Sequence, residues 1–179
     1  MKKLFIVVCI LAAIITGCKT EKVKPAVRND ISTGEIPAQE SWKSTIVMTD
    51  SGKTRAIVQT GHLRMMTVKQ ETLLDDGLQV DFYNRAQVKS TTLTSVSGKV
   101  DDRTKNLFAY QNVVAKNDSG VVLQTEQLMW DNAREKILTD KFVTITTRTE
   151  KMQGYGFESD QFLKNYTIFR ITYVTNVKN

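Results

Sequence analysis

Polar and apolar residues alternate along much of the chain in short runs that stop at turn-forming residues. The clearest run is LQVDFY at residues 78–83, in which Leu78, Val80 and Phe82 fall on one face of an extended strand. Further runs rich in Val, Ile and Thr occupy residues 46–48, 55–60, 63–68 and 113–116. No stretch holds three turns of helical periodicity, and the best helical candidate, residues 158–165, is short. The pattern predicts an all-β protein of many short strands.

Short segments between these runs contain a glycine preceded by Asp or Ser. They occupy residues 50–52, 75–77, 97–98 and 118–120. Asp and Gly adopt left-handed backbone conformations at low cost, so such segments commonly close β-hairpins. We therefore expect the chain to reverse direction at these places.

The chain also repeats itself, without a gap, at a spacing of 30 residues. Placing the two copies over each other pairs Val100 with Trp130 and Asp101 with Asp131. Each copy has the order strand, polar turn, strand, so we expect the first pair to pack in the interior. The second pair should begin turns, because an Asp side chain can bond the backbone that follows it.

The stretch LQTEQLMWD in the second copy could instead form the wall of an active site, because it holds Glu126 and Asp131 near Trp130. The repeat does not favour this interpretation, since Val96 takes the place of Glu126 in the other copy. A shorter echo, VQTGHL, lies 65 residues before LQTEQL. We therefore interpret the stretch as one strand unit and not as a catalytic wall.

The first 17 residues have the layout of a bacterial export signal. Two lysines precede an apolar run at residues 4–15, which is shorter than the roughly 20 residues that a membrane-spanning helix needs. The run leads into ITGC, which resembles a lipobox, where the cysteine becomes the acylated N-terminus of the mature protein. We expect residues 1–17 to be a lipoprotein signal peptide and Cys18 to be lipidated, with a plain membrane-anchor helix as the alternative.

The composition changes after this signal. Residues 18–41 hold both prolines of the chain and no sustained apolar periodicity, which is typical of a tether between the lipid and a folded domain. Residues 42–179 contain no proline and hold the strand-like runs. We expect them to form one β domain.

Charge and residue usage argue against several function classes. Lys and Arg number 25 against 19 Asp and Glu, without a block of like charges, whereas nucleic-acid binding usually needs a clustered basic face. The cysteines are Cys9, inside the expected signal, and Cys18, so the mature domain has no disulfide and no thiolate. His62 is the single histidine, and a metal site would need more ligands beside it. We expect no catalytic residues, no metal and no cofactor.

One strand-turn-strand unit carries a distinctive pattern of Leu, Thr, Glu, Trp and Asp. Its positions are Leu123, Thr125, Glu126, Leu128, Trp130, Asp131, Ile137, Thr139, Asp140, Val143 and Ile145. This pattern resembles the OstA-like lipopolysaccharide-transport domain. FYN at residues 82–84, LTSVSG at 93–98 and GYGFESD at 154–160 are similar to the LptC branch, the membrane-anchored periplasmic subunit of the lipopolysaccharide exporter. The resemblance covers about residues 42–170.

The resemblance implies a twisted, open antiparallel β-jellyroll or sandwich, whose two sheets form an apolar groove for the acyl chains of lipid A. It implies a domain that sits on the inner-membrane ABC transporter subunits and passes lipopolysaccharide to a soluble periplasmic partner of the same fold. Many family members are held by an uncleaved transmembrane helix, whereas the lipobox indicates a lipid anchor here. We expect the domain at the periplasmic face of the inner membrane, with the outer membrane as the alternative.

Apolar residues on the inward strand faces are candidates to line this groove. They are Ile57, Leu63, Val80, Phe82, Val100, Val113, Leu123, Trp130, Val143 and Ile145. An ordinary core is the alternative for each of them, because a β-sandwich needs an apolar interior whether or not it binds lipid. Gly154 and Gly156 indicate a bulge or a close backbone approach near the end of the sheet, where the resemblance places a partner edge.

The leading hypothesis is a non-enzymatic lipid-transfer and bridging module of the lipopolysaccharide exporter. The alternative, from another class, is a structural or assembly lipoprotein of the envelope whose β domain binds only protein partners. An envelope hydrolase is a third hypothesis, but no acid pair stands out from the residues expected in turns.

Overall fold

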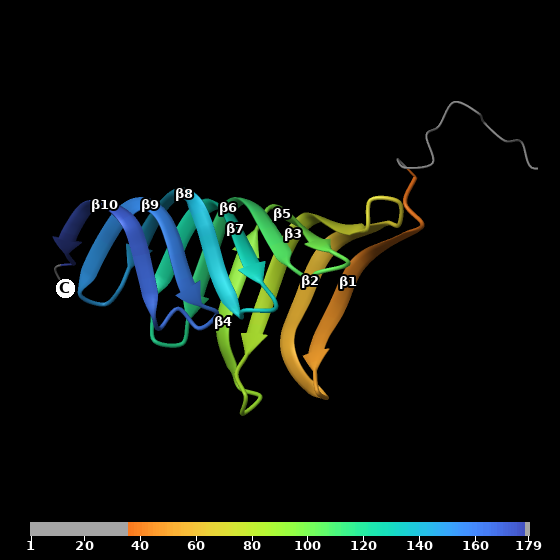
Figure 1. Ribbon diagram of the computed structural model, residues 1–179, viewed down its shortest axis with the longest axis horizontal. Coiled ribbons are helices and arrows are strands. Elements are labelled where there is room, and N and C mark those ends of the chain that lie inside the picture. The colour runs from red at the N-terminus through yellow and green to blue at the C-terminus, as the bar shows by residue number, and fades with distance from the viewer. Residues whose placement is uncertain (1–35, 178–179) are drawn as a thin grey trace, which may run out of the picture. The chain divides into compact units, whose positions relative to one another are not determined.

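The structure is a computed structural model that describes residues 36–177, which form ten antiparallel strands in a single sheet (Figure 1). The strands are β1 (Gln39–Asp50), β2 (Lys53–Met66), β3 (Glu71–Tyr83), β4 (Lys89–Ser95), β5 (Ser97–Asp101), β6 (Leu107–Asn117), β7 (Val122–Asp131), β8 (Lys136–Thr146), β9 (Glu150–Asp160) and β10 (Tyr166–Asn176). β4 and β5 lie end to end between β3 and β6, and the other strands pair in chain order. The predicted all-β, jellyroll-like antiparallel fold is confirmed.

The sheet bends along a line of irregularities that crosses its central strands. The pairing register shifts after Thr60 in β2, Tyr110 in β6, Thr125 in β7 and Thr139 in β8. At the same level β4 gives way to β5 at Val96. Bulges bend a strand and increase its twist, so the two halves of each strand end up in different layers.

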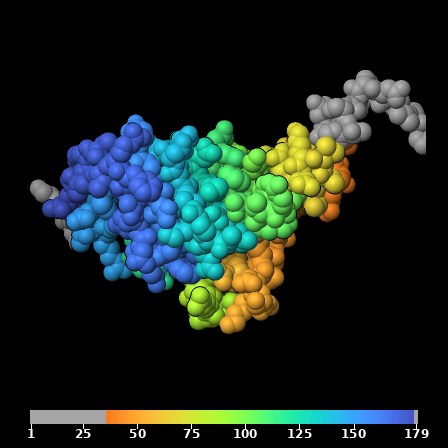
Figure 2. Space-filling model, in the orientation of Figure 1, coloured from red at the N-terminus to blue at the C-terminus, as the bar shows by residue number. Residues whose placement is uncertain are grey.

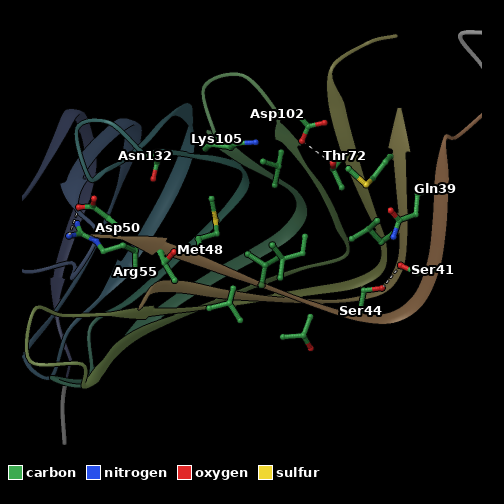
Figure 3. A pocket seen from close by; sticks show the side chains of 18 of the residues that line it. Gln39, Ser41, Ser44, Met48, Asp50, Arg55, Thr72, Asp102, Lys105 and Asn132 are labelled. Carbon is green, nitrogen blue, oxygen red and sulfur yellow. Dashed lines mark hydrogen bonds and ion pairs between the residues drawn. The ribbon is translucent and has the colours of Figure 1, made fainter. Parts of the chain in front are cut away.

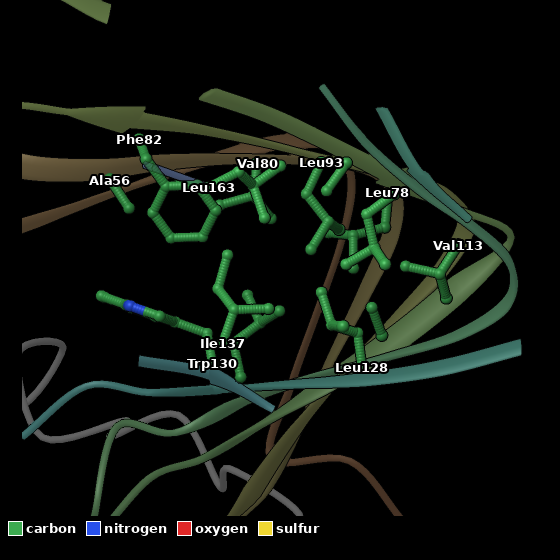
Figure 4. Packing of buried hydrophobic residues seen from close by; sticks show 14 of the residues in the cluster. Ala56, Leu78, Val80, Phe82, Leu93, Val113, Leu128, Trp130, Ile137 and Leu163 are labelled. Carbon is green, nitrogen blue, oxygen red and sulfur yellow. The ribbon is translucent and has the colours of Figure 1, made fainter. Parts of the chain in front are cut away.

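The two layers face each other across one apolar core (Figure 4). One layer holds Val80 and Phe82 from β3, and we call it the Phe82 layer. The other holds Trp130 from β7 and Ile137 from β8, and we call it the Trp130 layer. The alternation predicted for LQVDFY is confirmed, because Leu78, Val80 and Phe82 are all buried.

Threonine hydroxyls stabilise the bend. Thr60 Oγ1 lies 3.1 Å from the carbonyl oxygen of His62 and 2.8 Å from that of Asp75 on the next strand. Thr125 Oγ1 makes the equivalent approach to Phe142 O, at 2.9 Å. The echo between VQTGHL and LQTEQL therefore marks two equivalent corners of the sheet.

We expect Thr125→Val to lower the free energy of unfolding by about 1 kcal/mol, because the side-chain shape is kept while the partly buried hydrogen bond to the Phe142 carbonyl is lost. Urea denaturation followed by circular dichroism measures the change. Thr94→Val, at an exposed strand position, is the control and should stay within about 0.5 kcal/mol of the wild type. Equal effects of the two substitutions would show that the hydroxyl at the bend contributes nothing.

The hairpin turns expected at residues 50–52 and 118–120 are confirmed, since they connect β1 to β2 and β6 to β7. The reversals expected at residues 75–77 and 97–98 are wrong, because these residues lie within β3 and β5. Left-handed conformations at Asp76 (φ 58°) and Gly77 (φ 91°) bend the strand instead of reversing it. Residues 158–165, the best helical candidate, form the end of β9 and the turn that follows.

Aspartates begin the turns that the 30-residue repeat predicted. Asp101 Oδ1 accepts hydrogen bonds from the backbone N–H groups of Arg103 (3.0 Å) and Thr104 (2.8 Å). Asp131 Oδ1 accepts one from the N–H of Arg134, at 3.1 Å. The backbone N–H of Thr104 lowers the pKa of the Asp101 carboxyl below its usual value, against a smaller opposing effect of partial burial.

The pKa of the Asp101 carboxyl is lower in the folded state than in the unfolded state. The ionised carboxylate therefore contributes fully to stability above about pH 4, and this contribution is lost as the pH falls through the folded-state pKa. We expect Asp101→Asn to flatten the fall of the melting temperature below about pH 4. Asp118→Asn is the control, since the Asp118 carboxylate accepts a hydrogen bond from the Ser119 hydroxyl and not from a backbone N–H. Identical pH profiles for Asp101→Asn and the wild type would contradict this prediction.

Candidate functional site

A cavity of about 980 Å³ opens between the two layers at the β1 end of the sheet (Figure 3). Its apolar wall comes from Ile46 and Met48 of β1, Val58 and Leu63 of β2, and Val100 of β5. Ligand pockets for small molecules occupy roughly 300–1,000 Å³, so the cavity is large enough for one or more hydrocarbon chains.

The cavity exists because β1 is an edge strand. β1 pairs with β2 on one side only, whereas β2 to β9 are paired on both sides. Ile46 and Met48 point inward but are half-buried, while their pairing partners in β2, Val58 and Ala56, are fully buried. Lys105, from the loop after β5, lies across the cavity from Met48 (Figure 3).

Charged side chains surround the apolar interior. Arg55, at the start of β2, forms ion pairs with Glu135 in the β7–β8 turn and with Asp50 at 3.9 Å. Asp102 accepts a hydrogen bond from the Thr72 hydroxyl, at 2.9 Å. An apolar interior with charges of both signs at its border fits an amphiphile whose chains enter and whose polar group stays outside.

The predicted groove residues fall into three groups. Leu63 and Val100 line the cavity. Ile57 is half-buried and alternates with the buried Ala56 and Val58, so its side chain lies on the opposite face of β2. The remainder are buried in the core away from the cavity lining: Val80, Phe82, Val113, Leu123, Trp130, Val143 and Ile145.

Trp130 faces a closed core. Its side chain is 1% exposed, and its ring packs edge-on against Phe82 with 5.2 Å between the ring centroids. Because these two rings come from opposite layers, their contact brings the layers together. The open part of the interior therefore lies near β1 and not at the tryptophan.

Ile46 and Met48 line the cavity but were not among the predicted groove residues. Residues 46–48 do form part of a predicted strand, and their alternation with Val47 gives the inward face. The signal was present in the sequence, but a three-residue run does not show that it belongs to an edge strand.

Gly154 and Gly156 lie in β9, next to the edge strand β10. A Cβ added to Gly154 would lie 2.3 Å from the carbonyl oxygen of Arg170 in β10, so the expected close backbone approach is present. Gly156 has φ 74° and lies beside Phe169. The two glycines therefore shape how β10 attaches, and β10 itself presents the free edge.

β1 and β10 form the two ends of the sheet (Figures 1 and 2). β10 exposes several large apolar side chains, which are Phe169, Ile171, Tyr173 and Val174. Unpaired strand edges with exposed apolar residues are places where another sheet can add a strand. β10 is therefore a candidate surface for a protein partner.

Residues 36–177 contain no group of three or more His, Cys, Asp or Glu side chains that could hold a metal ion. In this range His62 Nε2 lies 2.6 Å from Glu40 Oε1, and its ring stacks on Trp42 with centroids 5.2 Å apart. The described part of the chain also has no helix of the length and apolarity needed to cross a membrane.

The comparison with protein families gives a match. A family described as "Lipopolysaccharide-assembly, LptC-related" matches residues 4–170, which include β1 to β9 and the first part of β10. No curated protein matches the chain. Members of the matching family are components of lipopolysaccharide transport and assembly on the periplasmic side of the envelope. The chain belongs to the LptC-related lipopolysaccharide-assembly family.

Proposed function

We propose that the protein is the membrane-anchored periplasmic subunit of the lipopolysaccharide export ABC transporter, and that it binds lipopolysaccharide acyl chains and passes them to a partner of the same fold. The observation that carries the proposal is the apolar cavity with a charged border at the β1 end of the sheet. It occurs in a member of a lipopolysaccharide-assembly family, for which an amphiphile with several acyl chains is the expected ligand.

The binding energy comes from the apolar wall. Each methylene that moves from water into contact with Ile46, Val58 and Leu63 contributes about 0.8 kcal/mol. The charged border, with Lys105, lies where the anionic part of the glycolipid would meet the cavity mouth. Chain and polar group are thus recognised by different parts of one site.

The N-terminal segment provides the attachment to the inner membrane. Cys18 and the expected tether up to residue 35 lie outside the described part of the chain. The predicted end of the tether at residue 41 is wrong, because residues 39–41 already belong to β1. The chain between Cys18 and Gln39 can span at most roughly 70 Å. Because β1 follows the tether directly in the sequence, the cavity end of the sheet is the part closest to the anchor along the chain.

The other end of the sheet passes the glycolipid on. The free edge of β10 and its exposed apolar residues suit strand addition by a soluble periplasmic partner with the same β fold. Pairing edge to edge would align the interiors of the two proteins, so that a lipid chain need not cross water. Ile171 and Val174 of β10 pair with Gly154 and Met152 of β9, which lie at inward positions. The two β10 side chains therefore lie on the inner face of the sheet, although both are exposed.

Depletion of the protein in cells should cause newly made lipopolysaccharide to accumulate at the inner membrane. Ile46→Glu should fail to relieve the accumulation, because a carboxylate in the cavity wall repels acyl chains. Ile57→Glu, at a half-buried position on the opposite face of β2, is the matched control and should restore export. Restoration by both variants at equal protein levels would contradict the acyl-binding function.

The exposed apolar edge of β10 also fits the second candidate, a structural lipoprotein that binds only protein partners. The double variant Ile171→Glu, Val174→Glu should weaken partner binding under either hypothesis. If Ile46→Glu supports normal export and the β10 variant does not, the protein-only function is the better account.

A further inference from the structure

The two layers of the sheet meet at a seam that is closed by a short turn. The turn consists of residues 161–165, between β9 and β10, and we call it the seam turn. The Asn117 Nδ2 amide, at the end of β6, donates a hydrogen bond to Phe162 O at 3.0 Å. On the other side, the backbone N–H of Gln161 donates to Glu135 O at 3.1 Å. The seam turn is therefore held by groups from both layers.

Leu163 anchors the seam turn in the core. Its side chain is 1% exposed and lies beside Phe82, in the part of the core that also holds Trp130 (Figure 4). Leu163 has φ 54°, a left-handed conformation that is unfavourable for a bulky side chain. The insertion of Leu163 therefore stores backbone strain in the turn.

The closed seam also buries polar atoms without partners. Within residues 36–177 the side-chain amide of Gln161 and Trp130 Nε1 have no hydrogen-bond partner, although both are buried. A buried polar group without a partner carries an unrecovered desolvation cost. Opening the seam would return the Gln161 amide to water, which lowers the free energy needed to open it.

An ion pair separates two cavities along the seam. Arg55 and Glu135 line the cavity of about 980 Å³ and also a second one of about 390 Å³, whose wall includes Gln161 and Phe162 of the seam turn. Arg55 belongs to the Phe82 layer. Glu135 belongs to the turn between β7 and β8, at the border of the Trp130 layer. The same pair therefore joins the layers and divides the space between them.

We propose that the seam turn and the Arg55–Glu135 pair form a gate that opens to let acyl chains pass from the β1 cavity into the core. Withdrawal of Leu163 frees an apolar slot beside Phe82, and separation of the ion pair joins the two cavities. The core residues that were predicted to contact lipid, such as Trp130, then become accessible to the chains. The nature of the ligand rests on the proposed function, whereas the opening itself is a property of the protein alone.

Hydrogen exchange of the full-length protein tests the opening without any ligand. The amide of Gln161 should exchange at least about a hundredfold faster than the central amides of β7, because the seam turn opens while the sheet stays folded. Arg55→Gln should increase the exchange rate of the Gln161 amide by about tenfold. Arg64→Gln, which removes the Arg64–Asp75 ion pair (2.6 Å) elsewhere on β2, should leave it unchanged. Exchange of Gln161 at the rate of β7 would overturn the gate.

Purified lipopolysaccharide then tests the gate in function. Joining Arg55→Cys and Glu135→Cys with a cleavable bifunctional thiol reagent should slow lipopolysaccharide uptake at least about tenfold, and cleavage should restore it. Uptake by the joined protein at the rate of the cleaved one contradicts the gate. A wild-type protein that takes up no lipopolysaccharide contradicts the proposed function instead, and the gate is then decided by hydrogen exchange.

Discussion

Replacing Trp130 with alanine is expected to lower the free energy of unfolding by about 3–5 kcal/mol, the largest effect of any single substitution considered for this protein. The indole is 1% exposed and bridges the two layers through its contact with Phe82, at 5.2 Å between ring centroids. Its removal leaves a cavity at the centre of the core, and the lost contacts and the cavity both destabilise the folded state.

Urea denaturation of Trp130→Ala and Trp42→Ala separates the effect of core position from that of side-chain size. Trp42 is 65% exposed and stacks on His62 in β2, so its removal should cost about 1 kcal/mol or less. Similar losses for the two variants would mean that Trp130 lies in an open groove and not in a closed core.

Replacing Gly154 with alanine is expected to cost about 3 kcal/mol and to loosen β10. The new Cβ would meet the carbonyl oxygen of Arg170 at 2.3 Å and Ile168 Cγ2 at 2.6 Å, and the backbone atom cannot move without disturbing the pairing of β9 with β10. The amides of β10 should lose protection from hydrogen exchange, while those of β6 and β7 keep most of theirs.

Gly52→Ala is the matched control for this substitution. Gly52 lies in the β1–β2 turn with φ 75°, and a Cβ there meets nothing within 4 Å. Alanine at this position should cost about 1–2 kcal/mol through the left-handed backbone alone and should leave β10 unaffected. A Gly154→Ala variant as stable as the wild type would show that β9 and β10 do not approach as closely as described.

Much of the fold could be predicted from local patterns. Alternation with period two identified the buried face of LQVDFY, and the repeat identified Val100 and Trp130 as packing positions. The bend could not be predicted, because a left-handed Asp-Gly pair serves a hairpin or a bulge equally well. Asp76 and Gly77 form a bulge because β3 pairs with a neighbouring strand on each side. This pairing involves residues distant in the sequence, so a local pattern does not reveal it.

The candidate site was harder to predict than the fold. Alternation tells which face of a strand is apolar, but it does not tell whether another layer covers that face. Leu63 and Phe82 look alike in the sequence, yet Leu63 lines the cavity and Phe82 is sealed in the core. The difference depends on the free edge of β1 and on the seam turn, whose Leu163 is distant from both in the sequence.

Photocrosslinking in cells tests the central claim most directly. A photoreactive amino acid in place of Ile46, on the cavity wall, should form a light-dependent adduct with lipopolysaccharide. The same amino acid in place of Ile57, half-buried on the opposite face of β2, should form none. Adducts with proteins at both positions and with lipopolysaccharide at neither would contradict the account.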